Sequence, residues 1–137
     1  MTEDDYISRL RAGWPQGSDA SLQVIALADE AVRSFPQSPR LLVMRGNLIQ
    51  LGPESCPHPL EEALHCYRRA VEIEPHFAEA WEEIGHYYDA VLDDEDGARP
   101  YFERAKALKG EPAASPNGGP ATRPGDSGVM GGPPSVS

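Results

Sequence analysis

The sequence predicts an all-α fold, and two observations carry that prediction. Apolar or small residues recur at steps of three and four between residues 77 and 108, which is the spacing of one face of an amphipathic helix. Equivalent residues also recur at intervals of 35 or 39 positions along the chain, which indicates repeated helical units. No strand is evident, so we expect helices that lie antiparallel and bury their apolar stripes against each other.

The N-terminal part is expected to form two helices. The first covers residues 4–12 with a weak apolar stripe, and Gly13 ends it. After a turn, Ser18 or Asp19 is placed to cap a longer helix that runs to Phe35. Because its pattern is the weaker one, this pair is the degenerate member of the repeat.

The middle pair has clearer boundaries. Ser38 is predicted to be an N-cap, with Pro39 at the first helical position, where the missing N–H of proline has no bond to lose. That helix ends at Gly52. Pro59 opens the next helix, which ends near Pro75, and the loop between the two helices is the longest connection in the predicted repeat.

The last pair is expected at residues 77–92 and 98–108. The acidic run at 93–96 and Gly97 are predicted to form the turn between these helices. Gly85 lies on the first apolar stripe and has no side chain, so the two backbones are expected to approach closely there.

The last pair also carries a distinctive order of residues: Trp81, Ile84, Gly85, Tyr88, Ala98, Phe102 and Ala105. This order resembles the tetratricopeptide repeat, which has tryptophan, leucine, glycine and tyrosine in its first helix and alanine, an aromatic residue and alanine in its second. The resemblance implies a short right-handed superhelix of three antiparallel helix pairs, with units at about residues 3–36, 38–75 and 77–109. The chain departs from the repeat at Gly97, which lengthens the turn, and at Gly110, which stands where a proline would close the unit.

Residues 1–110 are therefore expected to hold the whole domain. Residues 111–137 consist largely of proline, glycine, serine and alanine. Such a segment has too few apolar side chains to offset the entropy of ordering it, so we expect it to be disordered.

Composition argues against several classes of function. The net charge of −10 disfavours nucleic-acid binding, because no basic patch is present to displace the counterions of the phosphates. No apolar run approaches the roughly 20 residues that cross a bilayer, and the acidic N-terminus does not resemble a secretory signal. With two cysteines, we expect a cytoplasmic protein with reduced thiols and no membrane partner.

Metal binding has one candidate cluster: Cys56, His58, His65 and Cys66. Adjacent residues on a helix point about 100° apart, so His65 and Cys66 are not expected to reach one ion together. Cys56 and His58 are left as the basis of an alternative hypothesis, a metal-dependent regulator. The favoured interpretation has no metal and no cofactor.

The sequence also favours a protein that is not an enzyme. No triad of serine or cysteine with histidine has a supporting context, and no glycine-rich phosphate loop follows a strand. The carboxylates from Glu79 to Asp89 offer a formal acid–base pair, but nothing in the sequence indicates the burial that would shift their pKa values.

Function is expected on the concave face, which in the resembled family is lined by the first helix of each pair and holds a peptide or a partner's helix. On the last unit this face carries Glu79, Glu82, Glu83, His86 and Asp89. On the middle unit it carries Arg40, Val43, Met44, Asn47 and Gln50. The first set makes a negative wall, and the second is mostly neutral with two apolar side chains on a face expected to be polar, a sign of an interface.

We therefore expect a non-catalytic protein–protein interaction module that binds another protein or peptide through a basic and apolar segment. A further alternative is a homo-oligomeric scaffold. No capping helix is expected after Lys109, so the flank of the last helix is a candidate self-association surface.

Overall fold

The computed structural model describes residues 1–110, and the predicted disorder of residues 111–137 falls outside this part of the chain. The all-α prediction is confirmed for residues 1–110, which form helices and no strand. The elements are α1 (Glu3–Ala12), α2 (Leu22–Ser34), α3 (Pro39–Gln50), α4 (Glu61–Ile73), α5 (Ala78–His86), the π-helical turn η1 (Tyr87–Val91) and α6 (Glu95–Leu108).

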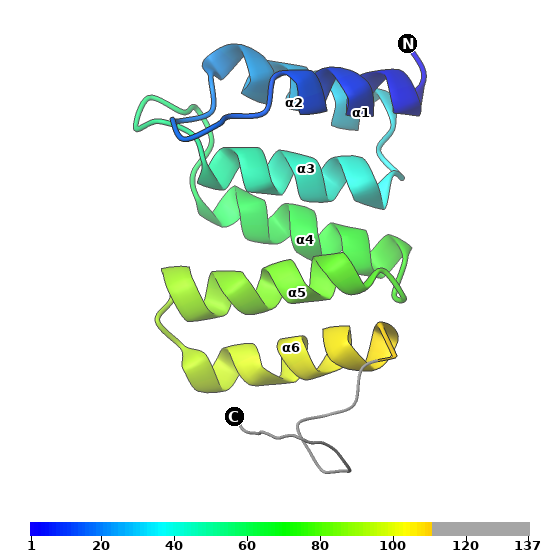
Figure 1. Ribbon diagram of the computed structural model, residues 1–137, viewed down its shortest axis with the longest axis vertical. Coiled ribbons are helices and arrows are strands. Elements are labelled where there is room, and N and C mark those ends of the chain that lie inside the picture. The colour runs from blue at the N-terminus through cyan, green and yellow to red at the C-terminus, as the bar shows by residue number, and fades with distance from the viewer. Residues whose placement is uncertain (111–137) are drawn as a thin grey trace.

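The helices lie side by side in chain order (Figure 1). The connections alternate between the two sides of the stack, so successive helices run in opposite directions (Figure 1). Each helix packs against the next one in the sequence. In addition, α1 contacts α3 and α3 contacts α5, so the odd-numbered helices form one continuous layer of the molecule.

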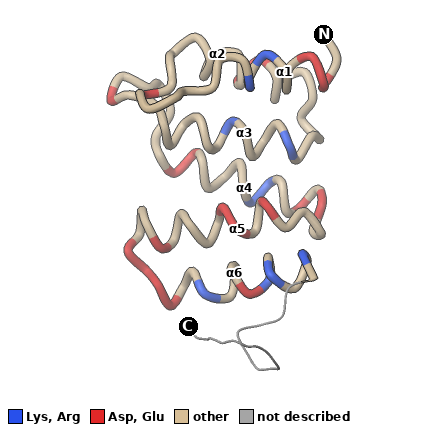
Figure 2. The backbone as a smooth tube through the Cα atoms, viewed as in Figure 1, with Lys and Arg blue, Asp and Glu red and all other residues tan. Residues whose placement is uncertain are grey.

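Charge is unevenly distributed over this stack. Figure 2 shows acidic residues along α5 and through the turn that leads into α6. Neither α5 nor η1 contains a lysine or an arginine. The helices before and after them carry both signs (Figure 2).

Ser38 caps α3, as predicted, and also ties it to α1. Its Oγ accepts a hydrogen bond from the Leu41 N–H at 3.2 Å and donates one to Glu3 Oε2 at 2.5 Å. Pro39 occupies the first turn of α3. Ser38 is buried, and both of these bonds satisfy its hydroxyl.

The predicted start of α2 is wrong by several residues. Neither Ser18 nor Asp19 caps this helix; Ser21 does, and its side chain accepts a hydrogen bond from Val24 N–H. The reason is a contact between distant segments. Ala20 is buried, and its N–H donates to the carbonyl of Leu51 at 2.8 Å, so the chain enters the helix only after this bond.

The turn between the last two helices also differs from the prediction. Gly97 lies inside α6 rather than in the turn, and its N–H donates to the capping carboxylate of Asp94 at 2.9 Å. The extra residue of this unit lies earlier in the chain, in the π-helical turn η1, which is wider than an α-helical turn. At the end of η1, the Leu92 N–H donates to the Tyr87 carbonyl. Asp93 then reverses the chain with a positive φ of 52°.

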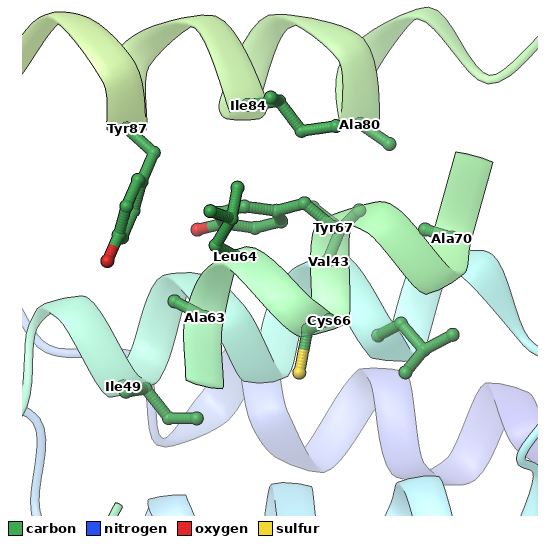
Figure 3. Packing of buried hydrophobic residues seen from close by; sticks show 11 residues of the cluster. Val43, Ile49, Ala63, Leu64, Cys66, Tyr67, Ala70, Ala80, Ile84 and Tyr87 are labelled. Carbon is green, nitrogen blue, oxygen red and sulfur yellow. The ribbon is translucent and has the colours of Figure 1, made fainter. Parts of the chain in front are cut away.

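The buried side chains form two clusters, one among α1, α2 and α3 and the other from α3 to η1. The second cluster contains Tyr67 of α4, which is fully buried (Figure 3). Gly46 lies against this ring, and a Cβ atom placed on it would lie 2.6 Å from Tyr67 Cε1. Gly85 lies in the same way against Phe102, at 2.8 Å. The close approach expected at Gly85 is therefore made to an aromatic ring, and Gly46 repeats it.

Candidate binding groove

A groove of about 230 Å³ crosses α1, α3 and α5 on the odd-numbered layer. Its lining residues are Ile7, Arg11, Trp14, Arg40, Val43, Met44, Asn47 and Glu79. The structure thus brings Arg40, Val43, Met44, Asn47 and Glu79 of the predicted set to one place. The sequence analysis missed the contribution of α1 and its following turn, because that pair had no clear match to the repeat.

The floor of the groove is apolar. Ile7 and Val43 form its base and are 4% and 2% exposed, whereas Trp14 and Met44 are half-buried and form its sides. The expectation that Val43 is a surface residue is wrong. Because α5 contacts α3 directly, Val43 joins the core cluster that contains Ile84.

The amide side chains of the middle unit already have partners. Tyr67 donates its hydroxyl to Asn47 Oδ1 at 2.6 Å, and Gln50 Nε2 donates to the same hydroxyl at 2.6 Å. Gln50 does not line the groove. Asn47 therefore helps to position Tyr67, and its hydrogen-bonding capacity is only partly left for a ligand.

The carboxylates of α5 have different surroundings. Glu79 is exposed and lines the groove. Glu82 forms an ion pair with Lys109, with Oε2 3.1 Å from Nζ, so it is turned toward the end of α6. The exposed Asp89 belongs to η1 rather than to α5. His86 is exposed, and its ring packs edge-on to Phe102 with centroids 5.0 Å apart.

Glu83 is the carboxylate with the most unusual environment. It is half-buried, and burial is the main reason that its pKa is raised above the usual glutamate value. His86 lowers that pKa, whereas the charges of Glu79 and Glu82 raise it further. The expectation that no carboxylate on this helix is buried enough to shift its pKa is therefore wrong for Glu83.

Cations border the other end of the groove. Arg40 is partly neutralised, because its Nη2 lies 3.3 Å from Asp4 Oδ1 and 3.8 Å from Glu3 Oε2. Arg11 is exposed and makes no ion pair with any of residues 1–110. The groove is thus positive at α1 and negative at α5.

The four candidate metal ligands contact different partners and do not converge on one point. His58 Nε2 lies 2.8 Å from Asp29 Oδ2, and the half-buried Cys56 packs against the N-terminal core. His65 is exposed beside Glu62, whereas the buried Cys66 faces Arg45. Within residues 1–110, no group of three or more His, Cys, Asp or Glu side chains is arranged to hold a metal ion.

A charged network that the sequence analysis did not predict joins α2, α3 and α4. Arg45 Nε donates to Asp29 Oδ1 at 2.8 Å, and Arg45 Nη1 donates to Glu62 Oε2 at 2.9 Å and to Cys66 Sγ at 3.0 Å. Burial by itself would raise the pKa of Asp29, but hydrogen bonds from Arg45 and His58 outweigh it and hold the pKa below its usual value. For the Cys66 thiol, burial prevails and raises the pKa.

A second, more open hollow of about 480 Å³ lies between α2 and α4. Arg45, Arg68 and Arg69 line it, and each has a partner. Arg45 is held by the network above, Arg68 donates to the Tyr88 hydroxyl at 2.7 Å, and Arg69 pairs with Glu72 at 3.6 Å. This hollow therefore presents arginines that are already engaged.

The exposed surface of α6 is charged rather than apolar. Among residues 1–110 the exposed large hydrophobic side chains are Met1, Leu22, Leu51, Leu60 and Leu92, and none belongs to α6. Its larger apolar side chains, Tyr101, Phe102 and Leu108, are half-buried, and the scaffold hypothesis stays a prediction. No helix within residues 1–110 has the length and apolar character needed to cross a membrane.

Comparison with known proteins adds no assignment. No protein-family model matches the chain, and no curated protein matches it.

Proposed function

We propose that this protein is a non-catalytic binding module that holds a segment of another protein in the groove across α1, α3 and α5. The bound segment presents a basic side chain to Glu79 and Glu83 and an apolar side chain to the floor. The observation that carries the proposal is the composition of the groove: half-buried Trp14 and Met44 line it together with the exposed carboxylate of Glu79. Glu83 is not a lining residue, but it lies one helical turn along α5 from Glu79.

The arrangement of helices supports a tetratricopeptide-like fold as the scaffold of this site. The odd-numbered helices contact one another in series, whereas contacts between the even-numbered helices are sparser, as on the inner and outer layers of a curved stack. The glycines Gly46 and Gly85 occupy equivalent positions against Tyr67 and Phe102, which supports a repeated unit. In this interpretation the groove lies on the concave side.

Electrostatics favours a basic ligand. The raised pKa of Glu83 means that its ionised form is destabilised by burial and by the neighbouring Glu79. A lysine or arginine that approaches both carboxylates relieves that penalty and forms charge-assisted hydrogen bonds. Binding is therefore expected to weaken as salt concentration rises.

The test is selection of random 12-residue peptides on the wild-type protein, followed by affinity measurements on variants. We expect enriched peptides to combine lysine or arginine with large apolar residues. The double variant Glu79→Gln/Glu83→Gln removes two ion pairs of roughly 0.5–1 kcal/mol each, so affinity should fall about tenfold.

Glu54→Gln/Glu103→Gln is the matched control, because both side chains are exposed, lie outside the groove and give the same change of charge. It should bind the selected peptides as the wild type does. The proposal is refuted if the peptides bind the groove variant and the control equally well, or if the selection enriches no basic residue.

A further inference from the structure

The two ends of the groove differ in charge, and this difference defines the ligand more narrowly than the proposed function, on which the inference rests. At the α1 end, Arg11 is a cation that no carboxylate of residues 1–110 neutralises. At the α5 end, Glu79 lines the groove and Glu83 lies one helical turn further along α5; neither has an arginine or lysine of residues 1–110 in contact. Glu82, by comparison, is neutralised by Lys109 and takes no part.

The partly exposed apolar side chains of the groove come from its α1 end and from its central helix, α3. Trp14 follows α1, and Met44 lies on α3. Both are half-buried, so each offers a partly exposed apolar surface to a ligand. A ligand that spans the groove therefore meets a cation, then apolar surface, then carboxylates.

Helix packing sets the length of that span. Packed helices lie about 8–10 Å apart, and the groove crosses from α1 through α3 to α5, so its ends are about 16–20 Å apart. An extended chain rises about 3.3 Å per residue, which gives five or six residues between the ends.

We propose that the groove recognises an extended peptide segment with an acidic residue at position i, apolar residues at i+2 and i+4, and a basic residue at i+6. Alternate side chains of an extended chain point to the same face, so these four residues face the protein together. The acidic residue lies against Arg11, and the basic residue lies between Glu79 and Glu83. The apolar pair covers Trp14 and Met44.

The test is a charge-reversal cycle with two synthetic peptides, acetylated and amidated. GDTLTLTKG has the proposed pattern, and GKTLTLTKG replaces its acidic residue with lysine; the threonines favour an extended chain. Each is titrated into the wild type and into Arg11→Glu, and amide chemical-shift changes report affinity and location. Arg9→Glu is the control, since Arg9 is an exposed arginine on the same helix that does not line the groove.

We expect the wild type to prefer GDTLTLTKG and Arg11→Glu to prefer GKTLTLTKG, with a combined coupling of about tenfold. Arg9→Glu should keep the wild-type preference. If the peptides bind with dependence on Glu79 and Glu83 but without coupling to Arg11, the acidic half of the pattern is wrong and the proposed function stands. If GDTLTLTKG does not bind at millimolar concentration, the pattern is wrong, and the peptide selection independently decides the proposed function.

Discussion

Adding one methyl group at Gly46 is a sharp test of how the stack is packed. In Gly46→Ala the new Cβ would lie 2.6 Å from Tyr67 Cε1, 2.9 Å from Tyr67 Cζ and 3.2 Å from the Ala63 carbonyl. The ring has no room to retreat. Tyr67 is fully buried, and its hydroxyl is fixed at 2.6 Å by both Asn47 and Gln50.

Two opposing contributions set the magnitude. Replacing glycine by alanine inside a helix gains about 0.8–1 kcal/mol of helix propensity. Forcing a methyl group into a filled core costs about 1–3 kcal/mol, and the fixed ring places Gly46 toward the upper end of that range. We therefore expect a net loss of about 1–2 kcal/mol, which lowers the melting temperature by at least about 4–8 °C.

Gly85→Ala is the matched comparison, measured by urea unfolding and thermal melts followed by circular dichroism. Its Cβ would lie 2.8 Å from Phe102 Cε1, but Phe102 is half-buried and has no hydrogen bond to hold its ring. This ring can move outward, so the loss should be within about 1 kcal/mol of zero. The argument that Tyr67 is fixed is refuted if Gly46→Ala is as stable as the wild type, or if it loses no more stability than Gly85→Ala.

Three further predictions concern charge and hydrogen bonds. Asp29→Asn should lose about 1–3 kcal/mol at pH 7 by urea unfolding, because half-buried Arg45 loses a charged partner. Since the native pKa of Asp29 is lowered, this difference should begin to shrink as the pH falls below about 4, near the unfolded pKa, and should disappear only below the native pKa. Glu83→Gln should raise the melting temperature at pH 7, because the raised native pKa means that the ionised carboxylate is unfavourable in the folded protein. This gain should vanish as the pH falls below about 4, where Glu83 is protonated in both the folded and the unfolded state. Tyr67→Phe should lose about 1 kcal/mol in the same unfolding assay, because Asn47 and Gln50 lose their shared partner but are only half-buried, so their amides can bond to water instead.

The parts of the fold that depend on local sequence were predictable. Apolar periodicity located the helices, and Ser38 with Pro39 placed the start of α3, because capping is decided within one turn of the chain. The start of α2 was missed because it depends on the bond from Ala20 to Leu51, residues far apart in the sequence. The π-helical turn was missed for a different reason: an added residue can be placed in a turn or inside a helix, and periodicity alone does not choose.

The candidate site shows the same division. Repeat spacing placed Met44 and Glu79 on one face, and both line the groove. It failed for Val43, because a helical wheel shows which residues share a face but not how far the next helix covers that face. It failed also for Arg11 and Trp14, since their part in the groove follows from the contact of α1 with α3 and not from a local motif.

A comparison of the α1–α3–α5 groove with the hollow between α2 and α4 gives the strongest reason to place function on the α1–α3–α5 side. In the hollow between α2 and α4, the arginines Arg45, Arg68 and Arg69 each have a hydrogen-bonding or ionic partner within the chain. Such pairing leaves little for a ligand to gain, because an existing interaction must first be broken.

In the groove, by contrast, Arg11 has no carboxylate partner among residues 1–110. Next to the groove, Glu83 keeps a raised pKa beside the lining residue Glu79. These charges do not stabilise the folded chain: an ionised Glu83 is unfavourable, and Arg11 gains no ion pair. They gain stabilisation only when opposite charges approach from outside. The same substitution at Glu83 is therefore expected to stabilise the free protein and to weaken its binding, an outcome that a purely structural role for this carboxylate does not produce.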